Sequence, residues 1–180
     1  MLGGLLICFL IRPHWVLLNY PVSYFGNFRA TIIPYVIGFV LCAYWLMRTI
    51  AELPAGMKTI RLPLLLVAVC SLAIPCTPYM INVAFGWIHL SVAVSLLIVE
   101  LWLSTLLILR TRHLYTWLGF VVLLCGAALA VLSEIGLLHV ELIGEMQLVV
   151  GSGVLLICSL GLMPVETRHV SDRQLVNNVN

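Results

Sequence analysis

Five long apolar stretches follow one another along this chain, with very few charged residues inside them. Each contains about 20 residues, which is the length that an α-helix needs to cross about 30 Å of hydrocarbon. Water solvates so many apolar side chains poorly, whereas lipid tails accept them on the outside of a fold. The sequence therefore predicts membrane-spanning helices over five ranges: 31–51, 62–81, 85–109, 115–138 and 146–163.

The composition supports this interpretation and argues against several other classes of protein. The 180 residues are 63% hydrophobic and only 9% charged, whereas a soluble domain carries about 25% charged residues. A net charge of +2 without any Lys/Arg run indicates no nucleic-acid partner. The six cysteines lie inside apolar runs without CxxC spacing, so we expect them to pack between helices rather than form disulfides or a metal site.

The first segment, residues 1–11, is apolar but too short to span a bilayer by itself. It lacks the basic start and the small-residue cleavage site of a signal peptide. It could be a short span, a half-helix that re-enters, or the end of a span that starts upstream, and we favour a short first helix that is retained. Residues 19–29, with Pro21 and Gly26, are expected to be irregular, with aromatic rings at the headgroup level.

Basic residues are distributed unequally between the two sides of the predicted bundle. Only Arg12 and Arg29 fall on one side, and the other side holds Arg48, Lys58, Arg61, Arg110, Arg112, Arg168 and Arg173. Because short cytoplasmic loops carry the excess of Lys and Arg, the second side is predicted to be cytoplasmic. The sequence thus predicts an all-α, polytopic transmembrane helix bundle of about six spans with both termini cytoplasmic. Residues 1–163 form its single domain, and 164–180 a short polar cytoplasmic tail.

One carboxylate, that of Glu100, lies near the predicted bilayer midplane. An ionised side chain there costs roughly 2–3 kcal/mol, so such residues usually face the bundle interior. His89 precedes Glu100 by about three helical turns and Ser104 follows it by one, which places all three on one face. This stripe could hold a proton or a cation, or anchor a polar substrate. Alternatively, Glu100 is a neutral acid bonded to a neighbouring helix, and His89 rests at the interface with one nitrogen in water.

A second group of polar residues is predicted at the outer end of the bundle. Glu134, His139 and Glu145 could line an outward cavity there, with Arg12 or Arg29 as the counter-charge. Glu145 could instead only stabilise the N-terminus of the last helix through the helix dipole. The spacing of these residues fits no metal-binding motif, so no metal is predicted.

Pro75 and Pro78 interrupt the stretch 62–81. Each removes a backbone N–H donor, so we expect the helix to kink or unwind in its outer half. The freed carbonyls could line a cavity or bind an ion, or the kink could be static and filled by Thr77. In the last two helices, Gly126, Gly151 and Gly153 predict close helix packing.

Three short motifs resemble those of a small six-helix bacterial membrane protein family of unknown function, which is similar to the damage-regulated autophagy modulator superfamily. Tyr20-Pro-Val-Ser-Tyr-Phe-Gly26 resembles the hydrophobic-Ser-x-hydrophobic-Gly signature after that family's first helix, and His89 stands at the outer start of the fourth helix. Gly144-Glu-Met-Gln147 is similar to the Gly-x-hydrophobic-Glu/Gln-Arg step that opens the last helix, with Met146-Gln147 where a Glu-Arg pair is common. The short first helix is a further departure. The resemblance implies a six-helix bundle and little about activity.

Three classes of function fit these features. The favoured hypothesis is a small transporter, channel or sensor whose polar interior contains Glu100, His89 and the proline kink. The alternatives are a non-catalytic structural or partner-binding subunit and a lipid-modifying enzyme. Because the sequence has no phosphate loop, nucleophile elbow or paired catalytic carboxylates, we expect no enzyme and no cofactor. The expected partners are the lipid bilayer and a membrane-protein partner or homo-oligomer. The absence of an Asn-x-Ser/Thr sequon favours a bacterial inner membrane.

Overall fold

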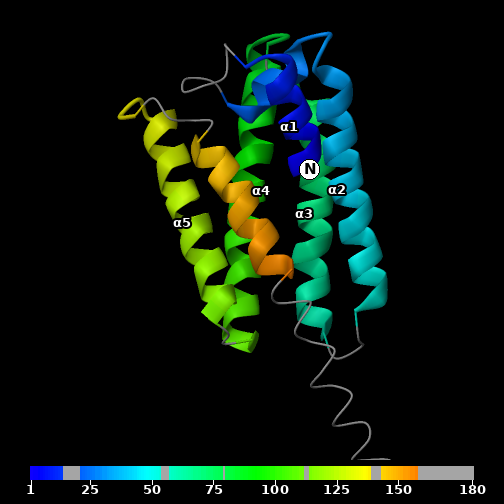
Figure 1. Cartoon of the computed structure of the whole chain (residues 1–180), viewed down its shortest axis with the longest axis vertical. Coiled ribbons are helices and arrows are strands. Elements are labelled where there is room, and N and C mark those ends of the chain that lie inside the picture. The colour runs from blue at the N-terminus through cyan, green and yellow to red at the C-terminus, as the bar shows by residue number, and fades with distance from the viewer. Residues whose placement is uncertain (14–20, 54–56, 79, 112–113, 139–142, 158–180) are drawn as a thin grey trace, which may run out of the picture.

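The computed structural model describes residues 1–13, 21–53, 57–78, 80–111, 114–138 and 143–157, and every regular element within these ranges is helical (Figure 1). The elements are α1 (Leu2–Ile11), the 3₁₀ helix η1 (Val22–Asn27), α2 (Ile32–Glu52), α3 (Lys58–Cys76), α4 (Val83–Thr111), α5 (Leu114–Glu134) and a last helix, Ile143–Ile157. The all-helical fold that the sequence predicts is confirmed for this part of the chain.

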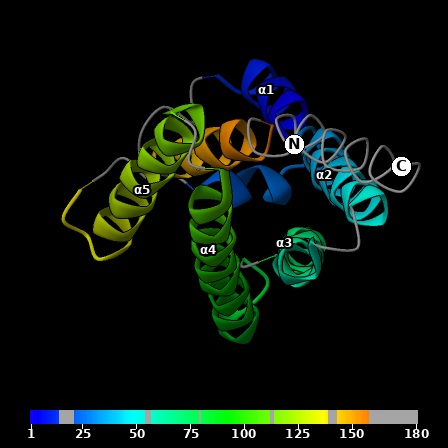
Figure 2. The ribbon, with the colours of Figure 1, turned by 90° about the horizontal axis from the view of Figure 1, so that it is seen from below.

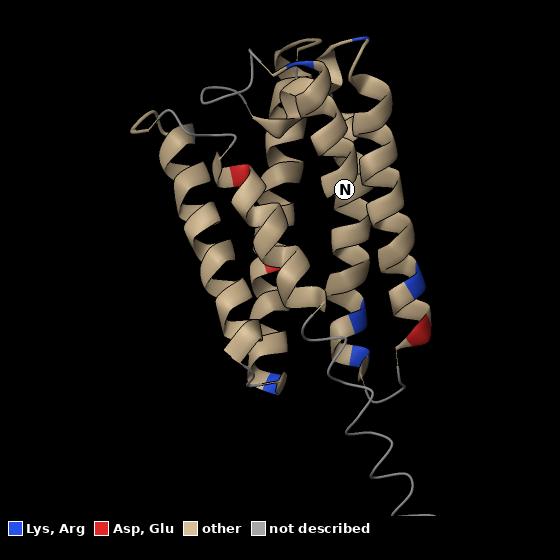
Figure 3. Ribbon diagram, in the orientation of Figure 1, with Lys and Arg blue, Asp and Glu red and all other residues tan. Residues whose placement is uncertain are grey.

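Four of these helices, α2 to α5, are long and apolar enough to cross a membrane. Their outward side chains suit lipid rather than water, since Ile33, Trp87 and Ile98 are 65%, 66% and 60% exposed. The described Lys and Arg residues gather at the two ends of the bundle and leave its middle free of positive charge (Figure 3). These features indicate an integral membrane protein in contact with the bilayer. At 1.5 Å per residue, α1 is about 15 Å long, shorter than a full span, and the described part of the last helix covers about 22 Å.

The helices form two packed clusters, one at each end of the bundle. The cluster toward the Arg48 end joins α2, α3 and α4 through residues such as Leu64, Leu103 and Leu107, each at most 3% exposed, and includes Leu155 of the last helix. The opposite cluster joins α1, η1, α2 and α3. Seen along the bundle, α2, α3 and α4 follow one another, and the last helix runs between α1 and α5 (Figure 2). The space between the two clusters holds the candidate site.

Glycines bring the last helix into close contact with α5. A β-carbon added at Gly126 would lie 2.5 Å from the backbone nitrogen of Leu148, and one at Gly151 would lie 2.5 Å from that of Leu123. The predicted packing role of these two glycines is therefore confirmed. For Gly153 the prediction is wrong, because no atom lies within 4 Å of its position for a β-carbon. Gly153 sits two residues, or about 200° of helix rotation, from Gly151 and faces away from α5.

Several element boundaries differ from the sequence prediction, and those of α3 differ most. Helix α3 ends at Cys76 rather than at 81, because Pro75 and Pro78 remove donors that a continuing helix would use. At its other end α3 begins at Lys58, one turn before the apolar run, where its charged first turn can meet the headgroups. Within 19–29, predicted to be irregular, residues Val22–Asn27 form a short 3₁₀ helix that begins after Pro21.

Candidate functional site

A cavity of about 460 Å³ opens between the two packed clusters. All the α-helices except α5 contribute to its wall, together with η1 and the last helix. Most of the lining is apolar, for example Phe39, Leu96 and Val67. The polar side chains are few, and they come from different helices: Ser23, Tyr35, Cys42, Ser71, His89, Glu100, Glu145 and Ser152.

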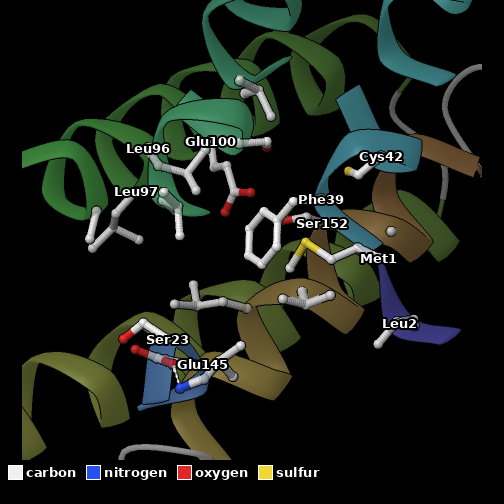
Figure 4. A pocket seen from close by; sticks show the side chains of 18 of the residues that line it. Met1, Leu2, Ser23, Phe39, Cys42, Leu96, Leu97, Glu100, Glu145 and Ser152 are labelled. Carbon is white, nitrogen blue, oxygen red and sulfur yellow. Dashed lines mark hydrogen bonds between the residues drawn. The ribbon is translucent and has the colours of Figure 1, made fainter. Parts of the chain in front are cut away.

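Glu100 enters this cavity from the middle of α4, and its carboxylate points toward the last helix (Figure 4). The hydroxyl of Ser152, in the last helix, interacts with this carboxylate. The contact is longer or less well aligned than a regular hydrogen bond, since the buried Ser152 Oγ has no partner that meets hydrogen-bond geometry. The Glu100 carboxylate therefore keeps acceptor capacity that this wall does not use fully.

Small polar groups from neighbouring helices surround Glu100. Cys42 of α2 and Ser71 of α3 line the same cavity as Glu100. Cys42 in turn interacts with the hydroxyl of Ser71, which is only 3% exposed. Cys42, Ser71, Glu100 and Ser152 all line the cavity, so one side chain from each of four helices forms a polar belt around its wall. We refer to these four residues as the polar belt.

His89 lines the cavity nearer to the η1 end and is fixed by the end of α3. Its Nδ1 atom lies 2.7 Å from the carbonyl oxygen of Thr77 and 3.1 Å from the Thr77 hydroxyl. Because a carbonyl only accepts, Nδ1 carries the proton and donates it to Thr77. The Thr77 hydroxyl lies 3.0 Å from the carbonyl oxygen of Ala73 and donates to it. Thr77 and His89 together satisfy carbonyls at the point where the prolines stop α3.

Glu145 ties the last helix to η1. Its carboxylate accepts a hydrogen bond from the backbone N–H of Val22, the first residue of η1. The first N–H groups of a helix have no partner within the helix, so an acidic side chain satisfies one of them well. Val22 and Ser23 belong to the cavity wall, and η1 thereby covers one end of the cavity. Glu145 also lies in the first turn of its own helix, where the dipole favours an acid.

Only some of the site residues predicted from the sequence line the cavity. Glu100 and His89 line the same cavity, whereas Ser104 is 2% exposed and lies outside the cavity wall, in the packed cluster region. Of the outer group, Glu145 reaches the cavity; Glu134 is the last residue of α5, and His139 lies outside the described residues. Among the described residues, no group of three or more His, Cys, Asp or Glu side chains could hold a metal ion.

Sequence reasoning did not single out Cys42, Ser71 or Ser152 as parts of a site. Each is an isolated small polar residue within an apolar helix, a pattern that packing residues share. Only the arrangement of the helices shows that they converge on Glu100.

Compared with known proteins, the chain matches no family model, no curated protein and no solved structure. Its function must therefore be inferred from the cavity and its walls.

Proposed function

We propose that the chain is an intramembrane binding protein of the transporter or sensor type, which takes up a small amphipathic molecule in the cavity between its helices. The observation that carries the proposal is an apolar cavity of about 460 Å³ with the Glu100 carboxylate directed into it. Ligand pockets typically measure about 300–1,000 Å³ and combine apolar walls with a few placed polar groups.

Packing considerations support an occupant for this cavity. Protein interiors are close-packed, and voids larger than a water molecule are few. The clusters on either side follow that rule, with Leu5, Leu64 and Leu107 at most 2% exposed. A large space between two such clusters, with a carboxylate in its wall, is better explained by a ligand than by loose packing.

We also propose the finer topology of six spans with both termini cytoplasmic. Its support is the distribution of charge. Arg48 lies near the end of α2, Lys58 and Arg61 lie in the first turn of α3, and Arg110 lies in the last turn of α4, all at one end of antiparallel helices. Arg12 and Arg29 lie at the opposite end. A fluorescent protein that matures only in the cytoplasm, fused after Asn180, should be bright in a bacterial host. Alkaline phosphatase, which is active only outside the cytoplasm, should be inactive when it is fused at the same position. A dark fluorescent fusion together with an active phosphatase fusion would contradict this orientation.

The binding proposal can be tested by photolabelling of the full chain in phosphatidylcholine vesicles. Azioctanol, an uncharged photoreactive alcohol, reacts with whatever side chain lies beside it when illuminated. Adducts at the cavity-lining residues Leu97 and Leu148 should saturate with concentration, because the cavity holds a limited number of molecules. Adducts at the lipid-facing residues Trp45 and Ile98 should rise linearly.

A pair of substitutions in the last helix provides the control. Gly153→Phe places a ring in open space beside the cavity and should abolish the saturable labelling. Val154→Phe adds the same ring at the neighbouring position, which is 40% exposed on the outer face, and should leave the labelling unchanged. Linear labelling at Leu97 and Leu148, or saturable labelling that survives Gly153→Phe, would show that the cavity binds nothing.

A further inference from the structure

We propose that the ligand of this cavity is a single-chain lipophilic amine, whose cationic head pairs with Glu100 while its alkyl chain lies along the apolar wall. The inference rests on the proposed binding function and names the chemical class of the ligand. Three features of the cavity wall support it: the sign of its charges, the partners that its two acids already have, and the apolar character of its other residues.

The charged side chains of the wall have one sign. Glu100 and Glu145 line the cavity, and no Lys or Arg does so among the described residues. A ligand carboxylate or phosphate would meet two acids and no basic side chain, and like charges at short range in a medium of low dielectric repel strongly. An anionic head group is therefore disfavoured, which leaves neutral and cationic ligands.

The two acids differ in what already binds them. Glu145 accepts the Val22 N–H and holds η1 in place. Among the described residues, Glu100 has only the imperfect contact with Ser152, and the neighbouring groups of the polar belt, Cys42 and Ser71, offer sulfur and oxygen acceptors. Acceptors in excess of donors suit an ammonium group, which has three donors and no acceptor. Glu100 is thus the carboxylate available to a cation.

An organic cation fits this wall better than a metal ion. Hard cations such as Ca²⁺ take six to eight oxygen ligands, whereas Glu100, Ser71 and Ser152 supply only a few. The rest of the wall is aliphatic and aromatic, including Leu46, Phe39, Leu97 and Leu156. Such a surface contributes affinity by burying an alkyl chain and contributes nothing to an inorganic ion.

Two other groups in the described part of the wall can carry a positive charge. One is the imidazole of His89, whose Nδ1 already donates to the Thr77 carbonyl. The other is Met1. It lines the cavity, and its α-amino group acts on Cys42. In Figure 4, Met1 lies on the same side of the view as Cys42, and Glu100 projects from α4. If Glu100 were already paired with this amino group, a ligand amine would gain no advantage over a neutral ligand, and the test below measures that advantage.

The test is competition against azioctanol labelling of Leu97 and Leu148, using decylamine, decanol and decanoate at matched membrane concentrations and pH 7. Hydrogen bonds to charged groups contribute about 1.5–3 kcal/mol, which corresponds to a factor of about 10–150. We therefore expect decylamine to compete at least about tenfold better than decanol, with decanoate weakest. In Glu100→Gln the amine and the alcohol should become equal.

Two variants keep this result interpretable. Glu100→Asp keeps the charge and should retain the amine preference, so it serves if Glu100→Gln fails to fold. Glu52→Gln makes the same acid-to-amide change at an exposed position paired with Arg48, and should change nothing. Saturable labelling with equal competition by amine and alcohol in the natural chain would refute the amine and leave the binding function standing. Absence of saturable labelling would refute both.

Discussion

Two glycines of the last helix, Gly151 and Gly153, should respond in opposite ways to the same substitution. An alanine β-carbon at 151 would lie 2.5 Å from the backbone nitrogen of Leu123, 2.7 Å from its Cα and 2.8 Å from its Cβ. Carbon atoms in contact rest about 3.5–4.0 Å apart, so the last helix and α5 must separate by roughly 1 Å. At 153 an added methyl group meets no atom within 4 Å.

The difference in stability between the two variants isolates this clash. Replacing Gly by Ala favours the helix by about 1 kcal/mol at either position, so that contribution cancels in the comparison. Overpacking typically costs about 1–3 kcal/mol. Gly151→Ala should therefore have a free energy of unfolding about 1–3 kcal/mol lower than that of Gly153→Ala.

Unfolding in mixed micelles by titration with sodium dodecyl sulfate, followed by circular dichroism, measures this difference. The midpoint should fall for Gly151→Ala and should be unchanged or higher for Gly153→Ala, with equal slopes. Equal midpoints would refute the close contact between α5 and the last helix. Gly126→Ala combined with Gly144→Ala adds a check, because each lies against the other's helix backbone and the two costs should be less than additive.

The remaining predictions concern the polar contacts at the η1 end. Thr77→Val removes the hydroxyl that lies 3.0 Å from the Ala73 carbonyl oxygen and 3.1 Å from Nδ1 of His89, and it keeps the backbone carbonyl that His89 also contacts. The substitution should lower the free energy of unfolding by about 1 kcal/mol, measurable as a lower midpoint in the same titration. Thr49→Val, which removes an exposed hydrogen bond to the Trp45 carbonyl, should not. Glu145→Gln weakens the acceptor for the Val22 N–H; hydrogen exchange at Val22 should become faster, while exchange in the middle of α2 stays unchanged. An unchanged Val22 rate would contradict the role of Glu145 in holding η1.

The sequence predicted the helices well because their apolar length is a local property. The predicted stretch 31–51 and the observed Ile32–Glu52 differ by one residue at each end. The end of α3 was harder to place, since the chain offers both Pro75 and Pro78 as stops, and the choice depends on Thr77 and His89 closing the helix end. The short 3₁₀ helix η1 was not foreseen, because Glu145, from 123 residues later in the chain, holds its first N–H.

The candidate site was only partly predictable for a related reason. Glu100 and His89 stand out because a charged or titratable side chain is rare in a span. Cys42, Ser71 and Ser152 do not stand out, and each becomes significant only through its distance from Glu100 in space. Ser104 shares the helical face of Glu100, yet it falls within the packed cluster below the cavity, since one helix face passes through both regions.

The last helix connects the packing of the bundle to the chemistry of the cavity. One of its faces presents Gly144 and Gly151, seven residues apart, to the backbone of α5. The neighbouring face, about 100° around the helix, presents Glu145 and Ser152 to the cavity, again seven residues apart. The contacts of Gly144 and Gly151 with α5 leave no room for a side chain, so they fix the rotation of the last helix about its axis. That rotation in turn fixes the direction in which the side chains of Glu145 and Ser152 point. The glycines therefore position the site without lining it, and the distance between Ser152 and Glu100 depends on the interface with α5 on the neighbouring face of the helix.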